Sequence, residues 1–208
     1  MAEVQAHGNT FEDIIIKKLT GKSKKEYDAL KGKGGYTSAM DLVKGLLVDE
    51  DYSIKTTGSN VVDCGDILGR MKEKSYIMIV GQWRQLDPTT KLIHTIYCFN
   101  VKSKDYKKLW GKNKIKVTER YVKKVKSVDH KDRLQIEDYR TPEKQDAWLE
   151  ELDWDFDALL RPNPKVNSQQ SRVQCSFKID RMIAAGVEYL KKDNMNIVIK
   201  KSPPRNKK

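Results

Sequence analysis

The sequence has few of the residues from which disulfide frameworks and zinc sites are built. Its three cysteines, Cys64, Cys98 and Cys175, are odd in number and far apart in the chain, and its three histidines are equally scattered. Structural zinc sites and disulfide frameworks need paired spacings such as C-x2-C, and zinc proteases need two histidines one helical turn apart. We therefore exclude zinc enzymes and expect reduced, structural thiols.

Long apolar runs are also missing. The longest, such as 76–81 and 46–48, fall far short of the roughly 20 residues that a membrane-spanning helix needs. The first ten residues have no basic flank followed by an apolar segment, as a secretory signal would. These features predict an intracellular, cytoplasmic protein without a membrane span.

Acidic residues are in the minority. The 208 residues include 41 Lys and Arg against 29 Asp and Glu, which gives a formal net charge of +12. A hydrophobic content of 38% allows one sizeable core at this length and excludes a wholly disordered chain. The excess of positive charge favours a polyanionic partner.

Apolar periodicity and turn residues predict the elements of the first half of the chain. We expect a helix at 10–20, a basic loop at 21–35, a hairpin of strands 40–48 and 52–57, a helix at 63–74, and strands at 76–83 and 92–101. This succession predicts an α/β (α+β) fold in which helices flank the faces of a mixed β-sheet.

Charge is segregated in the second half of the chain. Residues 102–126 contain eleven Lys or Arg, whereas 137–157 contain nine acids and an apolar stripe at helical spacing. Alternation around Val173 predicts a strand within 166–179, which is followed by a helix at 180–192 and an edge strand at 196–200.

These patterns predict three regions along the chain. We expect a core at 1–101 that contains the hairpin, a basic and acidic elaboration at 102–201 packed on the same domain, and a disordered basic tail at 202–208.

Three features near the start of the chain form a candidate active site. Glu12 lies on the first predicted helix, Asp41 enters the first strand of the hairpin, and Lys55 lies on the returning strand. The hairpin would bring Asp41 close to Lys55 at one end of the sheet. Hydrolysis of a phosphodiester needs a divalent ion, which one or two carboxylates can hold, and a fixed cation near the attacking water. Singly, each residue also fits a purely structural role, such as Glu12 at a helix start or Lys55 at a sheet edge.

The order Gly8-x2-Phe11-Glu12, Ser38-x2-Asp41, Ser53-Ile54-Lys55 resembles the PD-(D/E)xK nuclease superfamily, including type II restriction endonucleases and Holliday-junction resolvases. The resemblance covers residues 8 to about 83 and implies the αβββαβ core of that family. It further implies that Asp41 binds Mg²⁺, that Ile54 lends its backbone carbonyl and that Lys55 assists the attacking water. Glu12 would be the acid on the helix, which binds the metal directly or through water.

The chain departs from the family pattern at Ser53, which stands where the family has a second acid, and at Met40, which stands in place of proline. A serine hydroxyl is a weaker magnesium ligand than a carboxylate. Glu12 could compensate, or the role could fall to one of Asp51, Asp63 and Asp66; otherwise the site is inactive. Gln82, at the expected end of the next strand, is a candidate for orienting the scissile phosphate.

Two groups of residues are candidates for contacts with double-stranded DNA. Phosphate contacts are expected from Lys102, Lys104, Lys107, Lys108, Lys112, Lys114 and Lys116, while the aromatic residues of that segment either stack on bases or, as we favour, pack in the core. Base recognition is expected from Arg84, Asn167, Gln169, Gln170, Arg172 and Gln174, because Arg suits guanine and Asn or Gln suits adenine. A polar surface loop would explain the second group equally well.

The sequence therefore predicts a Mg²⁺-dependent, sequence-specific DNA endonuclease of the restriction-enzyme type. One active site cuts one strand, so double-strand cleavage would need a homodimer or two binding events. The alternatives are a non-catalytic nucleic-acid-binding or packaging protein, which the missing second acid favours, and a structure-specific junction resolvase.

Overall fold

The computed structural model describes residues 3–31 and 40–200, which form two compact units. Within this range the first unit comprises 3–31, 40–62, 75–101 and 188–200, and the second comprises 63–74 and 102–187. The chain passes from one unit to the other after Val101, while 63–74 lie in the second unit and 188–200 in the first. Ser38 of the family pattern and the predicted tail at 202–208 lie outside the described residues.

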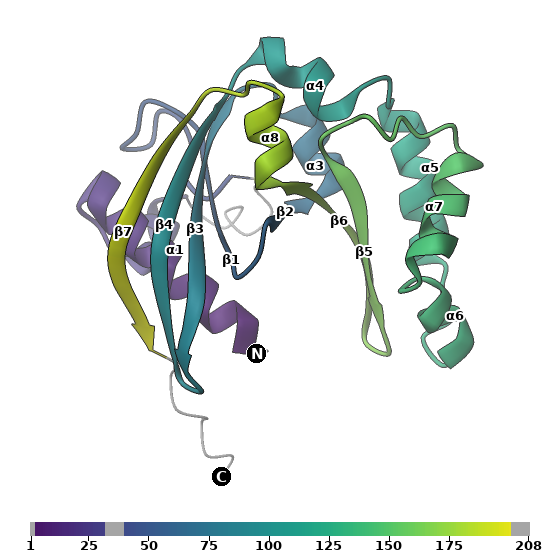
Figure 1. Cartoon of the computed structure of the whole chain (residues 1–208), viewed down its shortest axis with the longest axis horizontal. Coiled ribbons are helices and arrows are strands. Elements are labelled where there is room, and N and C mark those ends of the chain that lie inside the picture. Colours follow the sequence, from purple (N-terminus) through teal and green to yellow (C-terminus); the bar gives the residue numbers. More distant parts are fainter. Residues whose placement is uncertain (1–2, 32–39, 201–208) are drawn as a thin grey trace. The chain divides into compact units, whose positions relative to one another are not determined.

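A mixed four-stranded sheet and two helices build the first unit (Figure 1). The sheet order is β1-β3-β4-β7, in which β1 runs parallel to β3 and the other neighbours are antiparallel. The elements are α1 (Glu3–Thr20), α2 (Lys24–Lys31), β1 (Tyr52–Thr57), β3 (Tyr76–Asp87), β4 (Thr90–Val101) and β7 (Tyr189–Lys200). This arrangement confirms the predicted α/β (α+β) class with a mixed sheet.

The apolar stripe of α1 packs on this sheet. Phe11, Ile15 and Ile16 are buried in one cluster with Ile54 of β1 and Ile79 of β3. The spacing of these residues along α1 places them on one side of the helix. Burial of this stripe fixes α1, and with it Glu12, against the sheet.

The predicted hairpin is wrong in its first strand. Residues 40–48 form no strand, and only Leu42 makes an antiparallel bridge, to Tyr52. Gly45 and Leu47 have φ values of 83° and 65°, and this left-handed backbone cannot continue an extended strand. The segment therefore touches β1 at its start and then turns away into a loop.

Three other predictions in this unit need correction. The helix predicted at 10–20 begins earlier, at Glu3, and the predicted loop at 21–35 contains the helix α2. The helix predicted at 180–192 ends at Ala184, because Gly186 adopts φ 68° and the amide of Val187 bonds the Met182 carbonyl, which closes the helix. Residues 189–192 belong to β7 instead, which extends the edge strand predicted at 196–200.

The second unit contains a three-stranded sheet, of order β2-β6-β5, and short helices. Its strands are β2 (Val61–Asp66, of which the last four residues belong to this unit), β5 (Arg161–Asn167) and β6 (Gln170–Lys178). Its helices are α3 (Ile67–Lys72), the 3-10 turn η2 (Ser103–Asp105), α4 (Tyr106–Trp110), α5 (Ile115–Lys126), α6 (Arg133–Asp138), α7 (Pro142–Glu150) and α8 (Ile179–Ala184).

Two predictions in this unit are corrected. Only Ile67–Lys72 of the helix predicted at 63–74 is helical, because 63–66 belong to β2 and Asp66 caps α3 by accepting a hydrogen bond from the amide of Gly69 at 2.7 Å. The strand predicted around Val173 is confirmed as β6, but its partner β5, which contains Pro162 and Pro164, was not predicted. Cys64 and Cys175 are buried and Cys98 is partly buried, and none of the three forms a disulfide bond.

None of the described helices is long and apolar enough to span a membrane.

We predict that Gly81→Ala destabilises the first unit by about 1–3 kcal/mol, the usual cost of an overpacked core. A Cβ at Gly81 would lie 2.7 Å from the Phe11 ring and would push α1 off the sheet. Urea unfolding should show the loss in the parent background and a clearly smaller loss in a Phe11→Leu background, where the ring is absent. An equal loss in both backgrounds would contradict this account of the packing.

Candidate active site

Asp41 lies beside the outer edge of β1. Its Oδ2 atom accepts a hydrogen bond from the backbone amide of Ile54 at 2.6 Å and another from Lys55 Nζ at 2.9 Å. The backbone amide of Asp41 in turn bonds the Tyr52 carbonyl at 2.8 Å. Both side chains of the Asp41–Lys55 pair are 21% exposed, so solvent reaches the pair. The predicted proximity of Asp41 and Lys55 is thus confirmed, although a single bridge rather than a hairpin produces it.

The backbone of Ile54 faces the same edge. In a β-strand the N–H and C=O groups of one residue point to the same side, and the Ile54 amide points to Asp41. The Ile54 carbonyl is therefore directed away from β3 and toward the side on which Asp41 lies. This is the orientation that the resemblance requires of a carbonyl ligand.

Glu12 is carried into the neighbourhood of this pair by α1. Its side chain is only 14% exposed and forms an ion pair with Lys24. Burial and the negative charge of Asp41 raise the pKa of Glu12, against the opposing effects of Lys24 and Lys55. The two carboxylates are therefore close enough for their charges to repel each other.

Two lysines of α2 join the cluster and were missed from the sequence. Lys24 holds Glu12, and Lys31 Nζ donates to the backbone carbonyls of Met40 and Asp41. Burial lowers the pKa of Lys31, although the charge of Asp41 opposes this shift. The pKa of Lys24 is raised: burial lowers it, but the hydrogen bond and charge of Glu12 outweigh that effect. The seven-residue spacing of these lysines, two helical turns, was the signal that could have placed them on one face.

The structure limits which acid could replace the missing second ligand. Ser53 is fully buried on the same face of β1 as Lys55. Asp51 accepts a hydrogen bond from the Lys44 amide at 2.8 Å in the adjoining loop. Asp63 and Asp66 belong to the second unit, where Asp63 pairs with Lys165 and Asp66 caps α3. Of the four acids considered, we therefore favour Glu12, whose pKa burial and the charge of Asp41 raise.

The oxygen atoms near Asp41 can be compared with the ligands that a divalent cation needs. Within the described residues, no group of three or more His, Cys, Asp or Glu side chains gathers to hold a metal. Mg²⁺ nevertheless needs only one or two carboxylates, because it keeps several waters. The carboxylates of Asp41 and Glu12, which repel each other, and the Ile54 carbonyl fit such a site, with Lys24 as a competing partner for Glu12.

The strand that carries Gln82 and Arg84, β3, is longer than the strand predicted at 76–83. The strand continues to Asp87, so Gln82 is not at its end. The Gln82 amide donates to the Ser59 carbonyl at 3.1 Å, and its register partner is Thr57, two residues beyond Lys55. Arg84 is exposed on the arm formed by β3 and β4. Their roles toward DNA stay predictions.

The basic segment occupies η2, α4 and α5 of the second unit. Lys104, Lys107, Lys112, Lys114 and Lys116 are exposed, while Lys108 pairs with Asp105 at 3.3 Å and the Lys102 amide bonds the same aspartate. Trp110 and Tyr121 are buried, and the Tyr106 hydroxyl donates to the Met71 carbonyl at 2.9 Å. Packing therefore accounts for the aromatics, as we favoured, and the exposed lysines remain available for phosphate.

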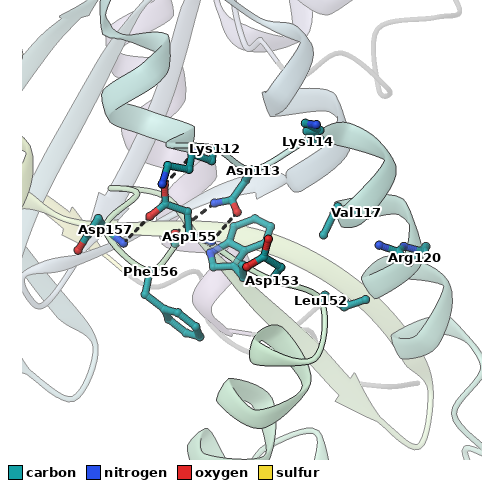
Figure 2. Close-up of a pocket in the computed structure, with 11 residues that line it drawn as sticks. Lys112, Asn113, Lys114, Val117, Arg120, Leu152, Asp153, Asp155, Phe156 and Asp157 are labelled. Atoms are coloured by element: carbon teal, nitrogen blue, oxygen red, sulfur yellow. Dashed lines mark hydrogen bonds between the residues drawn. The ribbon is translucent and has the colours of Figure 1, made fainter.

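A pocket of about 470 Å³ lies in the same unit (Figure 2). Lys112, Lys114 and Arg120 line it together with Asp153, Asp155 and Asp157. The Asp155 carboxylate is held by the Lys112 amide at 2.9 Å and the Asp157 amide at 3.1 Å, and these bonds lower its pKa. The pocket is therefore lined by groups of both charges, and no pattern in the sequence indicated it.

The residues expected to recognise bases lie on the hairpin of β5 and β6 in the second unit. Asn167 stabilises the turn between the two strands, because its Oδ1 atom accepts hydrogen bonds from the backbone amides of Gln169 and Gln170 at 2.8 and 3.1 Å. Gln169, Gln170 and Arg172 are exposed, and Gln174 is half-buried.

Comparison with models of known families, with curated proteins and with solved structures found no match for this chain. The residues themselves must therefore carry any functional argument.

We predict that Glu12 makes the protein less stable as the pH rises. The folded state holds the Glu12 proton more tightly than the unfolded chain, whose pKa is near 4.5, so stability falls from about that pH until the raised pKa is passed. Urea unfolding in EDTA should show a weaker fall with pH for Glu12→Gln than for the parent.

Glu26→Gln is the matched control, with the opposite sign. Hydrogen bonds from the Ser23 hydroxyl and amide lower the pKa of Glu26, which therefore stabilises the fold above its unfolded value and less below it. A Glu12→Gln profile parallel to that of the parent would show that the ionisation of Glu12 is not opposed by its surroundings.

Proposed function

We propose that this protein is a Mg²⁺-dependent endonuclease that hydrolyses phosphodiester bonds of double-stranded DNA at specific sequences, in the manner of PD-(D/E)xK restriction enzymes. The observation that carries the proposal is the contact of Lys55 Nζ with Asp41 Oδ2 at 2.9 Å, beside a strand edge toward which the Ile54 carbonyl points. Glu12 would supply a second carboxylate, whose pKa burial and the charge of Asp41 raise.

Asp41, Glu12 and the Ile54 carbonyl would hold Mg²⁺, which when bound supplies positive charge for the phosphoryl oxygens. Asp41 also orients Lys55, because one carboxylate oxygen binds both the Lys55 ammonium and the adjacent amide. Lys55 thereby presents a fixed cation at a partly exposed position, where it can position a water and stabilise developing negative charge.

Lys31 adds a second fixed cation beside the carbonyl of Asp41. The ammonium groups of Lys24, Lys31 and Lys55 stand beside the carboxylates of Glu12, Asp41 and Asp28, the last of which lies 3.5 Å from Lys24. A phosphodiester brings its own negative charge, with which Lys31 and Lys55 would pair. The exposed lysines of the basic segment supply further phosphate contacts, and cutting both strands would require two copies of the site.

A non-catalytic DNA-binding protein is the second candidate, and two observations favour it. Lys24 already neutralises Glu12, and three metal-ligating side chains do not gather anywhere in residues 3–31 and 40–200. In such a protein the lysine cluster would bind phosphate in place of a metal ion.

We predict that Asp41→Asn and Lys55→Ala each reduce cleavage of long, sequence-diverse DNA by about 10²-fold or more, because each removes a charge acting on the reacting phosphate. The parent protein should give discrete bands on a gel with Mg²⁺ and none with EDTA. Both variants should still retard DNA in EDTA.

Lys44→Ala is the matched control, since Lys44 is an exposed lysine of the same unit that pairs only with the exposed Glu50 among the described residues. Its cleavage rate should equal that of the parent. Intact but retarded DNA in every lane, including that of the parent with Mg²⁺, would refute the nuclease and establish the DNA-binding protein.

A further inference from the structure

The hairpin of β5 and β6 has one apolar and one polar face. Val166, Val173, Cys175 and Phe177 are buried, and the residues between them are half-buried or exposed. Because side chains alternate between the two sides of a strand, the intervening residues share the opposite face. We call this the hairpin face; it consists of Arg161, Asn163, Lys165, Asn167, Gln170, Arg172, Gln174 and Ser176.

The register sets these side chains side by side across the two strands. Asn163 pairs with Gln174, and Lys165 pairs with Arg172. Two cations directly opposite each other destabilise a sheet. Asp63 of β2 offsets part of this repulsion, because it binds Lys165 at 3.1 Å and Asn163 at 2.6 Å.

The β6 side of the hairpin face is left for a ligand. Asp63 engages Lys165 and Asn163 of β5, whereas no hydrogen bond or ion pair within the described chain engages the side chains of Gln170, Arg172 and Gln174. Arg172 is exposed and has no carboxylate within salt-bridge distance among the described residues. These three side chains alternate along one strand with a spacing of about 7 Å, close to two base-pair steps of DNA.

The hairpin is held rigidly from behind. Helices α3 and α5 contact β6, the Asn167 carbonyl bonds His130 Nδ1 at 2.7 Å, and the Val166 carbonyl bonds Arg140 Nε at 3.1 Å. β5 is the outer strand of its sheet, and Pro162 and Pro164 remove donors from it, so a further strand cannot pair there fully. The hairpin face is thus a preorganised surface rather than a flexible loop or a sheet-extension site.

We propose that the hairpin face reads base edges in the major groove of duplex DNA, with Arg172 and Gln174 as specificity-determining residues. This inference rests on the proposed function for its polyanionic partner. A guanidinium makes two-point contacts with guanine O6 and N7, and a glutamine amide does so with adenine N6 and N7. The major groove admits a two-stranded ribbon, and base-edge recognition uses side chains of this kind on strands.

Charge and hydrogen-bonding capacity favour duplex DNA over other partners. The hairpin face carries cations and amides but no exposed large apolar side chain that would anchor a protein or a lipid surface. Duplex RNA has a deep, narrow major groove that side chains cannot read. Asp63 acts as a positioning residue, since it holds the β5 side chains while those of β6 stay available.

Selection from a pool of random DNA duplexes in EDTA, followed by sequencing of the bound fraction, tests the inference without cleavage. The parent should enrich a short motif that contains both G·C and A·T pairs. Arg172→Ala should reduce the preference for guanine at one position by about 10- to 100-fold, and Gln174→Ala should do the same for adenine at another. Arg172→Lys, which keeps the charge but loses the two-point contact, should behave like Arg172→Ala.

Lys131→Ala is the matched control, an exposed cation of the same unit outside both the hairpin face and the basic segment, and should leave the motif unchanged. The inference is overturned by any of three results: the parent does not bind DNA, the motif is the same for the parent and the Arg172 and Gln174 variants, or an RNA duplex competes as well as DNA.

A separate digestion with Mg²⁺ tells the two proposals apart. If the protein binds a motif but does not cut it, base recognition by the hairpin face is supported and the nuclease activity is refuted. If the protein cuts at specific sites and the Arg172 and Gln174 variants cut at the same sites, the nuclease activity is supported and base recognition by the hairpin face is refuted.

Discussion

The first unit depends on how the outer edge of β1 is satisfied. β1 ends the sheet, so its outward N–H and C=O groups need partners other than a neighbouring strand. The segment at 41–43 supplies them, through the backbone of Leu42 opposite Tyr52 and the carboxylate of Asp41 on the Ile54 amide. The Asp41 carboxylate, which bonds the Ile54 amide at this edge, is thereby placed beside Lys55. The candidate site depends on that pair.

Charge balance distinguishes this cluster from an ordinary surface ion pair. Burial and the charge of Asp41 raise the pKa of Glu12, while Lys24, Lys31 and Lys55 approach from two different elements. Partial burial strengthens all of these interactions relative to water. Such a cluster can exchange partners, because a phosphate can replace a carboxylate beside a lysine and a cation can replace a lysine beside a carboxylate. The proposed nuclease requires that a cation replace a lysine beside a carboxylate. The proposed binding protein requires only that a phosphate replace a carboxylate beside a lysine.

The sequence indicated the type of most elements but misplaced several of their boundaries. The helix expected at 63–74 begins only after Asp66, which caps it, and the helix expected at 180–192 ends before Gly186. Residues 189–192 pair instead with β4, about 95 residues away in sequence, and local periodicity does not report such a pairing. The 40–48 segment has strand-like composition, but Gly45 and Leu47 turn it. In the site, Asp41 and Lys55 were found by spacing, whereas Lys24 and Lys31 were hidden in a segment expected to be a loop.

The sequence by itself determined the mixed α/β class, the lack of zinc and disulfide spacings, the positive charge and the candidates Glu12, Asp41 and Lys55. These follow from composition, periodicity and short spacings, which act within a few residues. Only the tertiary structure decided that one bridge replaces the hairpin, that Asp63 turns to Lys165, and that β5 pairs with β6 to gather amides and cations on one face. Those outcomes depend on strand register and helix packing, which join residues far apart in the chain and leave no local mark in the sequence.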